Sequence, residues 1–359
     1  MDRRLRVALL FGGRSAEHDV SLMSAANVYG ALDPARYEVV AIAVARTGAW
    51  MLCPLPDGKF PTRVPDHGSL ITLLPGGGGR LVIASADSSV EPPAPIDVIF
   101  PVLHGPFGED GSVQGLAEHA GVPFVGASVF ASAAAMDKVA AKRLLRDAGL
   151  PTPRFRVVTP DDAPSFAEVA AELGRPLFVK PARLGSSVGV GKADTAEEFA
   201  AALAEAFRHD RKVLIEEFMR GREVECGVLE DANGTLTTSL PGEIVPTNRY
   251  AFYTYEAKYL DEHGAVLKVP ADLPNAVVKR VQELSLRAFQ ALGCEAMARI
   301  DFFLREDMSV VVNEVNTIPG FTNISMYPLA FKASGVSYSE LVDRLIQHAL
   351  ARAARAPSA

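Results

Sequence analysis

Hydrophobic positions follow two different spacings along this 359-residue chain, and the changes of spacing mark its elements. Continuous apolar runs predict buried strands at 5–11, 37–45 and 97–103, and helical spacing predicts a helix at 20–32. Strands that alternate with helices form parallel sheets, which bind ligands near the carboxyl ends of their strands. We therefore expect an α/β domain over residues 1–127.

The rest of the chain alternates between helical and strand spacing in two further units, which we place at 128–215 and 216–359. Asp194 can cap a helix that runs to about His209. The elements expected are, in order, a helix at 136–148, strands at 177–180 and 212–218 with the capped helix between them, a strand at 223–229, a helix at 274–292, strands at 296–304 and 310–316, and two closing helices.

The charge balance narrows the class of partner. Lys and Arg number 36 and Asp and Glu 43, so the formal net charge is −7. A surface of this sign argues against nucleic acid or an anionic membrane as the partner. The three cysteines lack CxxC spacing, which predicts free thiols in the cytoplasm rather than a disulfide framework. Because no apolar run reaches the roughly 18 residues that span a bilayer, we expect a cytoplasmic protein.

The strongest local motif is a pair of strands near the C-terminus that carries acidic and amide side chains. Glu314 and Asn316 are two residues apart and share one face of a strand. If the turn is centred between Asp307 and Met308, Asp301 lies opposite Glu314, and two facing carboxylates repel unless a cation lies between them. Oxygen ligands suit Mg²⁺. A solvated surface hairpin is the alternative, although the flanking apolar residues favour a buried setting.

A glycine-rich loop between Lys180 and Lys192 is the second motif. Its small residues allow backbone N–H groups to approach phosphate oxygens, and its lysines supply countercharge. It is not a Walker A loop, because Ser186 and Ala193 stand where that pattern needs its first glycine and its final Ser or Thr. The chain also lacks G-x-G-x-x-G, which disfavours a dehydrogenase. A flexible hairpin turn is the alternative for this loop.

Three other segments are candidates for binding. The run 104–111 follows a predicted strand, and the helix after it offers free N–H groups to an anion, although an ordinary capped turn fits as well. Glu17 follows the first strand in a comparable position, where a glutamate is more often a cap than a ligand. The segment 250–259 holds five aromatics in ten residues, which indicates either a substrate lid or packing onto a neighbouring domain.

Taken in order, these motifs resemble those of the D-alanine–D-alanine ligases of the ATP-grasp superfamily. The resemblance implies an N-terminal parallel-sheet domain and two α+β subdomains that sandwich ATP. It also implies that ATP phosphorylates the carboxylate of one D-alanine and that the amine of a second attacks the acyl phosphate. The products would be D-alanyl-D-alanine, ADP and phosphate, for peptidoglycan precursor synthesis. The matching segments are 12–17, 104–111, 136–138, 180–189, 256–259, 299–301 and 313–320, with no recognised motif in 46–95.

The resemblance assigns residues to the nucleotide and to metal. Lys138 and Lys180 match lysines that contact the phosphates of ATP, and Lys258 matches a third near the γ-phosphate. The positions that match the adenine hinge and the ribose are Glu216, Glu217, Phe218, Met219 and Glu223. Two Mg²⁺ ions are implied, with Mn²⁺ as an alternative ion. Their implied ligands are Asp301, Glu314 and Asn316.

The first D-alanine has its own set of implied contacts. Glu17 matches the carboxylate that holds its ammonium group, and Ser186 and Tyr259 match the hydrogen-bonded partners that tie the lid shut. His104 matches a residue near the same substrate. Tyr259 also carries the implied specificity, because related ligases that use D-lactate depart from this tyrosine pattern.

The second D-alanine and the reacting centre have further implied contacts. Arg299 and the backbone around Gly320 match groups that stabilise the acyl phosphate and the oxyanion. Ser325, together with Arg299, matches the contacts to the carboxylate of the second D-alanine. A homodimer is also implied, with D-alanine and ATP as the small-molecule partners.

Two other functions stay open at this point. One is a ligase of the same superfamily with another second substrate, such as D-serine or D-lactate. The other is a nucleotide-binding protein without catalysis, against which stands the full set of phosphate and metal residues.

Overall fold

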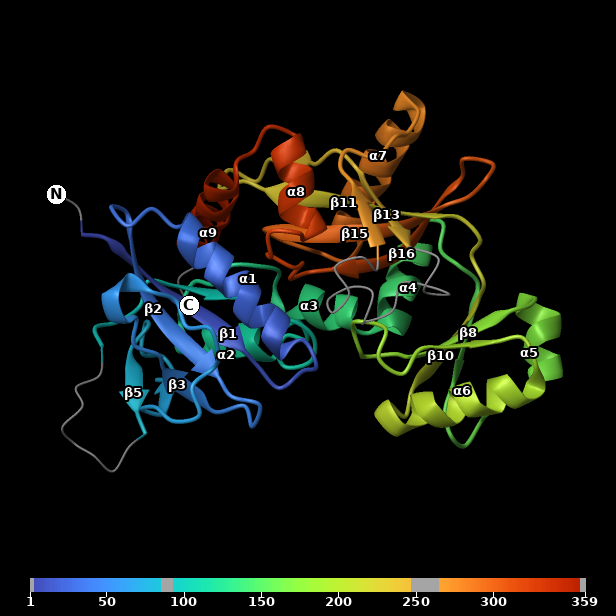
Figure 1. Cartoon of the computed structure of the whole chain (residues 1–359), viewed down its shortest axis with the longest axis horizontal. Coiled ribbons are helices and arrows are strands. Elements are labelled where there is room, and N and C mark those ends of the chain that lie inside the picture. The colour runs from blue at the N-terminus through green and yellow to red at the C-terminus, as the bar shows by residue number, and fades with distance from the viewer. Residues whose placement is uncertain (1–2, 85–92, 247–264, 356–359) are drawn as a thin grey trace.

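The computed structural model describes residues 3–84, 93–246 and 265–355, and it forms three lobes that are each built on a sheet (Figure 1). The first lobe lies at the left of the view and the second at the lower right. The third lies above the seam between them. The mixed α/β class expected from the sequence is confirmed.

The first lobe is a four-stranded sheet covered by helices. Its elements are β1 (Leu5–Gly12), α1 (His18–Ala31), β2 (Tyr37–Val44), β3 (Trp50–Leu52), a 3-10 turn (Pro56–Gly58), β4 (Ile71–Leu73), β5 (Leu81–Ile83), β6 (Val98–Pro101) and α2 (Ser112–Ala120). The strand order is β3-β2-β1-β6, and β1 pairs in parallel with β2 and β6, as predicted. Val7 and Leu9 face one core and Ala8 and Leu10 the other, so β1 is buried on both sides.

The second lobe is a smaller antiparallel sheet with the strand order β7-β10-β8-β9. Its elements are β7 (Phe155–Val158), α5 (Phe166–Leu173), β8 (Leu177–Pro181), β9 (Gly191–Ala193), α6 (Ala196–His209) and β10 (Val213–Glu217). Apolar residues of α5 and α6 pack with the sheet into one core, which includes Val169, Leu203 and Ile215.

The cap of α6 differs from the prediction. Thr195, not Asp194, is the N-cap, because its Oγ1 accepts the N–H of Glu198 at 3.2 Å. The Glu198 carboxylate in turn accepts the N–H of Thr195, which completes a capping box. Asp194 contributes only its backbone N–H, to the same carboxylate at 2.7 Å.

The third lobe is built on the largest sheet, in the strand order β14-β13-β11-β15-β16, with β12 paired to β11. Its elements are β11 (Arg222–Glu230), β12 (Leu236–Thr238), β13 (Gly242–Pro246), β14 (Ala265–Lys268), α7 (Asn275–Ala291), β15 (Met297–Leu304), β16 (Val310–Asn316), α8 (Met326–Ala333) and α9 (Tyr338–Arg355). The predicted helix end at Gly293 and the two closing helices are confirmed.

Two helices that precede the second sheet in sequence pack into the core of the third lobe. These are α3 (Val129–Met136) and α4 (Lys138–Asp147). Ala131 and Leu145 belong to the same apolar cluster as Leu284 of α7 and Ile300 of β15. The domain boundaries near 128 and 216 stay predictions.

The β15–β16 hairpin pairs Asp301 with Glu314, as predicted, but the turn differs from the one assumed. Next to the turn, Leu304 pairs with Val310, so the hairpin is centred on Asp307 and not between Asp307 and Met308. If this register continued along the strands, Asn313 would lie opposite Asp301. A β-bulge leaves Asn313 without a partner in the register, so Glu314 lies opposite Asp301. Bulges of this kind re-aim side chains next to functional sites.

The apolar contact between the first and third lobes is more extensive than the contact of the second lobe with α4. The first and third share one apolar core, in which the rings of Phe100 and Phe321 meet edge-on with centroids 6.0 Å apart. The second lobe meets α4 through a small cluster formed by Val139, Ala182 and Leu214. Because small interfaces permit domain motion, we expect the second lobe to be the one that moves.

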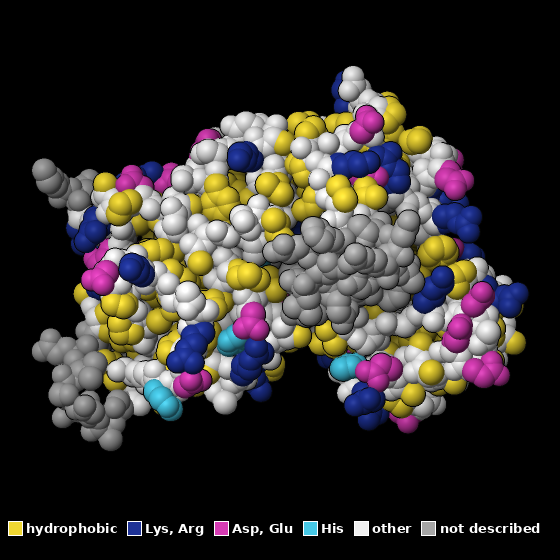
Figure 2. Space-filling view, in the orientation of Figure 1, with side chains coloured by type: hydrophobic (Ala, Val, Ile, Leu, Met, Phe, Trp, Pro, Cys, Tyr) yellow, Lys and Arg dark blue, Asp and Glu magenta, His cyan; other side chains and the backbone are white. Residues whose placement is uncertain are grey.

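The composition predicted a surface without a large basic region and cysteines with free thiols, and the structure agrees with both. Basic and acidic side chains are interspersed on the face shown in Figure 2, without one field of positive charge. All three cysteines are free and buried. Among residues 3–84, 93–246 and 265–355, no helix has both the length and the apolar character needed to cross a bilayer.

The capping box of α6 gives a stability prediction. Thr195→Ala removes the side-chain acceptor, so we expect the free energy of unfolding to fall by about 1 kcal/mol. Asp194→Ala is the matched control, because it keeps the backbone N–H that Asp194 donates to Glu198. We expect it to change the free energy of unfolding by less than about 0.5 kcal/mol. Urea denaturation of both variants is the measurement. Equal losses would mean that Asp194 shares the capping role.

Candidate active site

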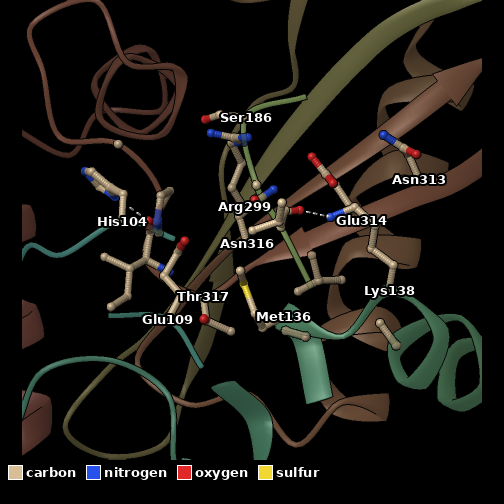
Figure 3. A pocket seen from close by; sticks show the side chains of 18 of the residues that line it. His104, Glu109, Met136, Lys138, Ser186, Arg299, Asn313, Glu314, Asn316 and Thr317 are labelled. Carbon is tan, nitrogen blue, oxygen red and sulfur yellow. Dashed lines mark hydrogen bonds between the residues drawn. The ribbon is translucent and has the colours of Figure 1, made fainter. Parts of the chain in front are cut away.

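Two adjoining pockets lie where the lobes meet. The small pocket, of about 70 Å³, lies between the first and third lobes and is lined by Glu17, His104 and Arg299 among others. The large pocket, of about 320 Å³, lies between the second and third lobes, and its volume is within the range of small-molecule sites. Lys138 and Glu314 line both. Figure 3 shows the small pocket, with His104 on one side and Lys138 on the other.

The loops after β1 and β6 form one wall of the small pocket. These strands are parallel neighbours, so their carboxyl ends lie together. Ser15 Oγ donates to the carbonyl oxygen of His104 at 2.7 Å and accepts the N–H of Glu17 at 3.1 Å. At Gly105, which has φ +74°, a Cβ would lie 3.1 Å from Glu17 Oε2, so the close approach of the two loops requires glycine.

His104 is buried in this wall in its neutral form. Its Nδ1 donates to the carbonyl oxygen of Ile318 at 3.1 Å, and its Nε2 accepts the hydroxyl of Ser24 at 3.2 Å. Burial lowers the pKa of His104, although the nearby Glu17 carboxylate opposes this shift. The ring therefore joins the first lobe to the loop after β16 without adding charge.

Glu109 lines the same pocket and binds the loops after β6 and β16. One of its oxygens accepts the N–H of Gly105 at 2.6 Å and the other accepts the N–H of Ile318 at 3.3 Å. Burial, together with the charge of Glu17, raises the pKa of Glu109 to about 8. The structure therefore places a second acidic group beside Glu17, and at neutral pH it holds its proton.

The loop after β8 reaches across the cleft to the first lobe. Ser186 Oγ donates to Glu17 Oε1. At Gly185, a Cβ would lie 3.3 Å from the other oxygen of this carboxylate. Ser186 and Ser187 have φ values of 51° and 59°, in the left-handed region that serine seldom occupies. Lys138 Nζ donates to a carbonyl oxygen of this loop, which is held between the two pockets.

Aromatic rings form a flat wall in the large pocket. Phe178 and Phe218 stack with centroids 5.8 Å apart and an interplanar angle of 13°. Lys192 Nζ lies 5.4 Å from the centre of the Phe218 ring. A flat apolar surface beside the backbone of residues 216–219 suits a planar base that hydrogen-bonds at its edge.

Beside this wall, one buried carboxylate is held by two lysines. Glu216 Oε1 lies 2.7 Å from Lys142 Nζ, and Glu216 Oε2 lies 2.5 Å from Lys180 Nζ. Burial alone would raise the pKa of Glu216, but the two ammonium charges outweigh it and lower this pKa to about 2. Burial likewise opposes the charged form of Lys180, yet the Glu216 carboxylate outweighs it and raises the pKa of Lys180. The carboxylate is therefore ionised.

The residues expected to bind metal lie together on the β15–β16 hairpin. Arg299 donates to both oxygens of Asp301, at 2.7 and 2.8 Å, and its Nε also lies 2.9 Å from Glu225 Oε2. Asn316 Nδ2 donates to Asp301 at 3.0 Å.

The oxygen donors of this hairpin fit a hard divalent cation. The Asp301 carboxylate accepts hydrogen bonds from Arg299 and Asn316. Since the two oxygens of a carboxylate offer about four lone pairs, these bonds do not exclude a metal ion. Within the described ranges, no group of three or more His, Cys, Asp and Glu side chains is arranged around a common metal position.

The structure brings most of the expected residues to the two pockets. Asp301 and Ser325 are exceptions, because neither lines a pocket: the Asp301 carboxylate is paired with Arg299, and Ser325 lies beside Gly320, where a Cβ would be 2.7 Å from the Ser325 hydroxyl. Lys258 and Tyr259 lie outside the described residues. The expected residues that line a pocket are Glu17, His104, Lys138, Lys180, Ser186, Glu216, Glu217, Phe218, Met219, Glu223, Arg299, Glu314, Asn316 and Gly320.

Three residues of the site, Glu109, Lys142 and Glu225, have no role that the sequence alone predicts. Glu109 belongs to the run 104–111, but the spacing of that run does not reveal its contact with a loop 209 residues away. Lys142 lies four residues after Lys138, a spacing that places both on one helix face and could have drawn attention to it. Glu225 carries no signal apart from its strand, whereas Asn313 opens the matching segment 313–320 without a role assigned to it.

The three lobes, with a cleft between the second and third, have the ATP-grasp architecture. Models of one family match both parts of the chain: "D-ala D-ala ligase N-terminus" at residues 6–127 and "D-ala D-ala ligase C-terminus" at residues 144–347. The chain belongs to the D-alanine–D-alanine ligase family.

Individual relatives agree with this family. The chain is 59% identical to "D-alanine--D-alanine ligase A" of Mesorhizobium japonicum, over 98% of this chain and 99% of the relative. The ligase of Coxiella burnetii is 38% identical with a TM-score of 0.86, over 98% and 95% of the two chains. The VanG D-Ala:D-Ser ligase of Enterococcus faecalis is 33% identical with a TM-score of 0.85, over 97% and 100%.

The raised pKa of Glu109 predicts a pH-dependent stability. Between its ordinary value of 4.5 and about 8, the unfolded chain releases this proton while the folded chain keeps it, so this group lowers stability as pH rises. Glu109→Gln removes that titration. We expect the unfolding free energy of the variant, relative to the unsubstituted protein, to rise by roughly 1 kcal/mol per pH unit between pH 5 and 8.

Denaturation at several pH values measures this slope. Glu118→Gln, on the exposed side of α2, is the control for the loss of one negative charge. A difference between Glu109→Gln and the unsubstituted protein that does not change with pH would contradict the prediction.

Proposed function

We propose that the protein joins two D-alanines to D-alanyl-D-alanine at the expense of ATP. The observation that carries this proposal is the contact between Ser186 and Glu17 at the junction of the two pockets. It joins a small pocket that contains an acidic group for an ammonium to a large pocket that contains lysines and a flat apolar wall. An amino acid and a nucleotide bound there would meet at the shared residues Lys138 and Glu314.

In the first step, a carboxylate oxygen of the first D-alanine attacks the γ-phosphorus of ATP. The new O–P bond forms as the bond to the bridging oxygen breaks, and ADP leaves. Glu17 holds the ammonium of this D-alanine, and Lys138 and Lys180 balance charge on the phosphates. Position and countercharge are the main contributions of a protein to phosphoryl transfer.

In the second step, the neutral amine of the second D-alanine attacks the carbonyl carbon of the acyl phosphate. A C–N bond forms, the tetrahedral intermediate collapses as the C–O bond to phosphate breaks, and the departing phosphate takes the proton that the amine nitrogen loses. Arg299 and the backbone near Gly320 stabilise the oxyanion, as oriented donors do in acyl transfer. The resemblance adds Ser325, with Arg299, as a contact to the carboxylate of the second D-alanine, although Ser325 lines neither pocket and its hydroxyl bonds to Thr322.

Asp301, Glu314 and Asn316 would hold two Mg²⁺ ions, with Mn²⁺ as an alternative. When bound, the ions supply countercharge to the phosphates. Arg299 orients the Asp301 carboxylate through two hydrogen bonds. Glu216 and the backbone of residues 217–219 would bind the adenine.

Other parts of the proposal follow from the resemblance. Glu223 binds the ribose, and Lys258 and Tyr259 act from a lid, Lys258 at the γ-phosphate and Tyr259 with Ser186. The protein functions as a homodimer in the cytoplasm, where peptidoglycan precursors are made. It needs neither nucleic acid nor a membrane.

Product identification tests the reaction. With ATP, Mg²⁺ and D-alanine we expect mass spectrometry to show D-alanyl-D-alanine together with ADP and phosphate. Since a relative with 33% identity is a D-Ala:D-Ser ligase, D-serine and D-lactate should be offered in competition with D-alanine. We expect the D-alanine product to form at least about tenfold faster. ADP release without a dipeptide would reject the proposal.

Metal dependence tests the role of Asp301. Asp301→Asn keeps the shape but removes the charge, so we expect half-saturating Mg²⁺ to rise by about tenfold or more. Asp307→Asn changes an exposed aspartate in the turn of the same hairpin and is the matched control. An unchanged Mg²⁺ requirement in Asp301→Asn would remove this residue from the metal site.

A further inference from the structure

Lys142 is a buried cation at the back of the site, and no step above uses it. It lies on α4, four residues after Lys138, and only 2% of its surface is exposed. Its Nζ lies 2.7 Å from Glu216 Oε1 on β10 and donates to the carbonyl oxygen of Asn313 on β16 at 3.2 Å. One ammonium group therefore contacts the second and third lobes from the helix between their sheets.

The first contact changes how Glu216 and Lys180 share charge. Each oxygen of Glu216 has its own lysine. Burial lowers the pKa of Lys142, and the Glu216 carboxylate opposes this shift and favours the charged ammonium. If Lys142 were absent, Lys180 would be the only cation bonded to this buried carboxylate among the residues that the structure describes. A buried carboxylate without a partner is costly, so Lys180 would then be held at Glu216. With Lys142 present, Lys180 can turn to a phosphate while Glu216 keeps a countercharge.

The second contact fixes the bulge in β16. Asn313 is the extra residue of that bulge and has no partner in the strand register. Its carbonyl oxygen therefore turns away from the ladder, where Lys142 binds it. The same bulge determines that Glu314 lies opposite Asp301. The ammonium group thus supports the backbone that presents the metal-side carboxylate.

We propose that Lys142 is a positioning residue of the nucleotide site, which holds Glu216 on the adenine side and the Asn313 bulge on the metal side in one fixed relation. It reaches the nucleotide only through these two groups. A Met or Leu would fill the same volume at lower desolvation cost, and buried ion pairs are weak evidence for stability as such. This inference rests on the proposed function, because it assumes that the large pocket binds ATP.

Equilibrium binding of ADP, with and without Mg²⁺, tests this role apart from turnover. Lys142→Met removes the charge and keeps the length of the side chain. We expect ADP with Mg²⁺ to bind at least about tenfold more weakly, and KM for D-alanine to change by less than about twofold. Arg344→Met is the matched control, because Arg344 forms a partly buried ion pair with Asp231 in the third lobe at 2.7 and 2.8 Å, away from both pockets. It should lower the melting temperature without changing either constant.

Lys142→Arg keeps the experiment decisive if the Met variant does not fold. It retains a buried cation but moves its donors, so we expect ADP to bind about threefold or more weakly. ADP binding equal to that of the unsubstituted protein, in whichever of the two variants folds, would overturn the proposal. So would a loss of ADP and D-alanine affinity by the same factor. If the unsubstituted protein binds no ADP, the proposed function fails instead, and the two failures are distinguishable.

Discussion

Carboxylates buried where the lobes meet impose the main energetic constraint on this structure, because each of them needs a partner from another segment. Glu216 on β10 is held by Lys142 on α4 and by Lys180 on β8. Glu17 receives the hydroxyl of Ser186 from the opposite side of the cleft. The contacts that satisfy these charges also set the relative positions of the lobes, so the geometry of the site and the assembly of the fold have the same cause.

The sequence predicted the elements well where one residue pattern determines one element. Continuous apolar runs located β1, β2 and β6, and the glycine at 293 located the end of α7. The Asp301–Glu314 pairing was right, but the assumed turn was wrong, since backbone geometry at Asn313 restores the register. Asp194 is a residue type that caps helices well, but Thr195 is the cap because it also has Glu198 three residues later, which completes the capping box.

The site was predictable only in part, because its chemistry depends on burial and on contacts between distant segments. Motif order predicted Glu17, Lys180 and the metal-side hairpin. It did not reveal that Glu109 binds the backbone of Ile318 and keeps a proton at neutral pH. The fold does not select the second substrate either, since relatives named for D-alanine and for D-serine match it with TM-scores of 0.86 and 0.85.

The central claim is that the two pockets form one site, in which a carboxylate bound beside Glu17 attacks a nucleotide bound beside Lys180. Oxygen transfer tests it most directly. D-alanine labelled with ¹⁸O in its carboxylate is incubated with the protein, Mg²⁺ and ATP, and the released phosphate is examined by ³¹P NMR. The account predicts one labelled oxygen in each phosphate, carried over from the acyl phosphate. Unlabelled phosphate would show that water cleaves ATP and would contradict it.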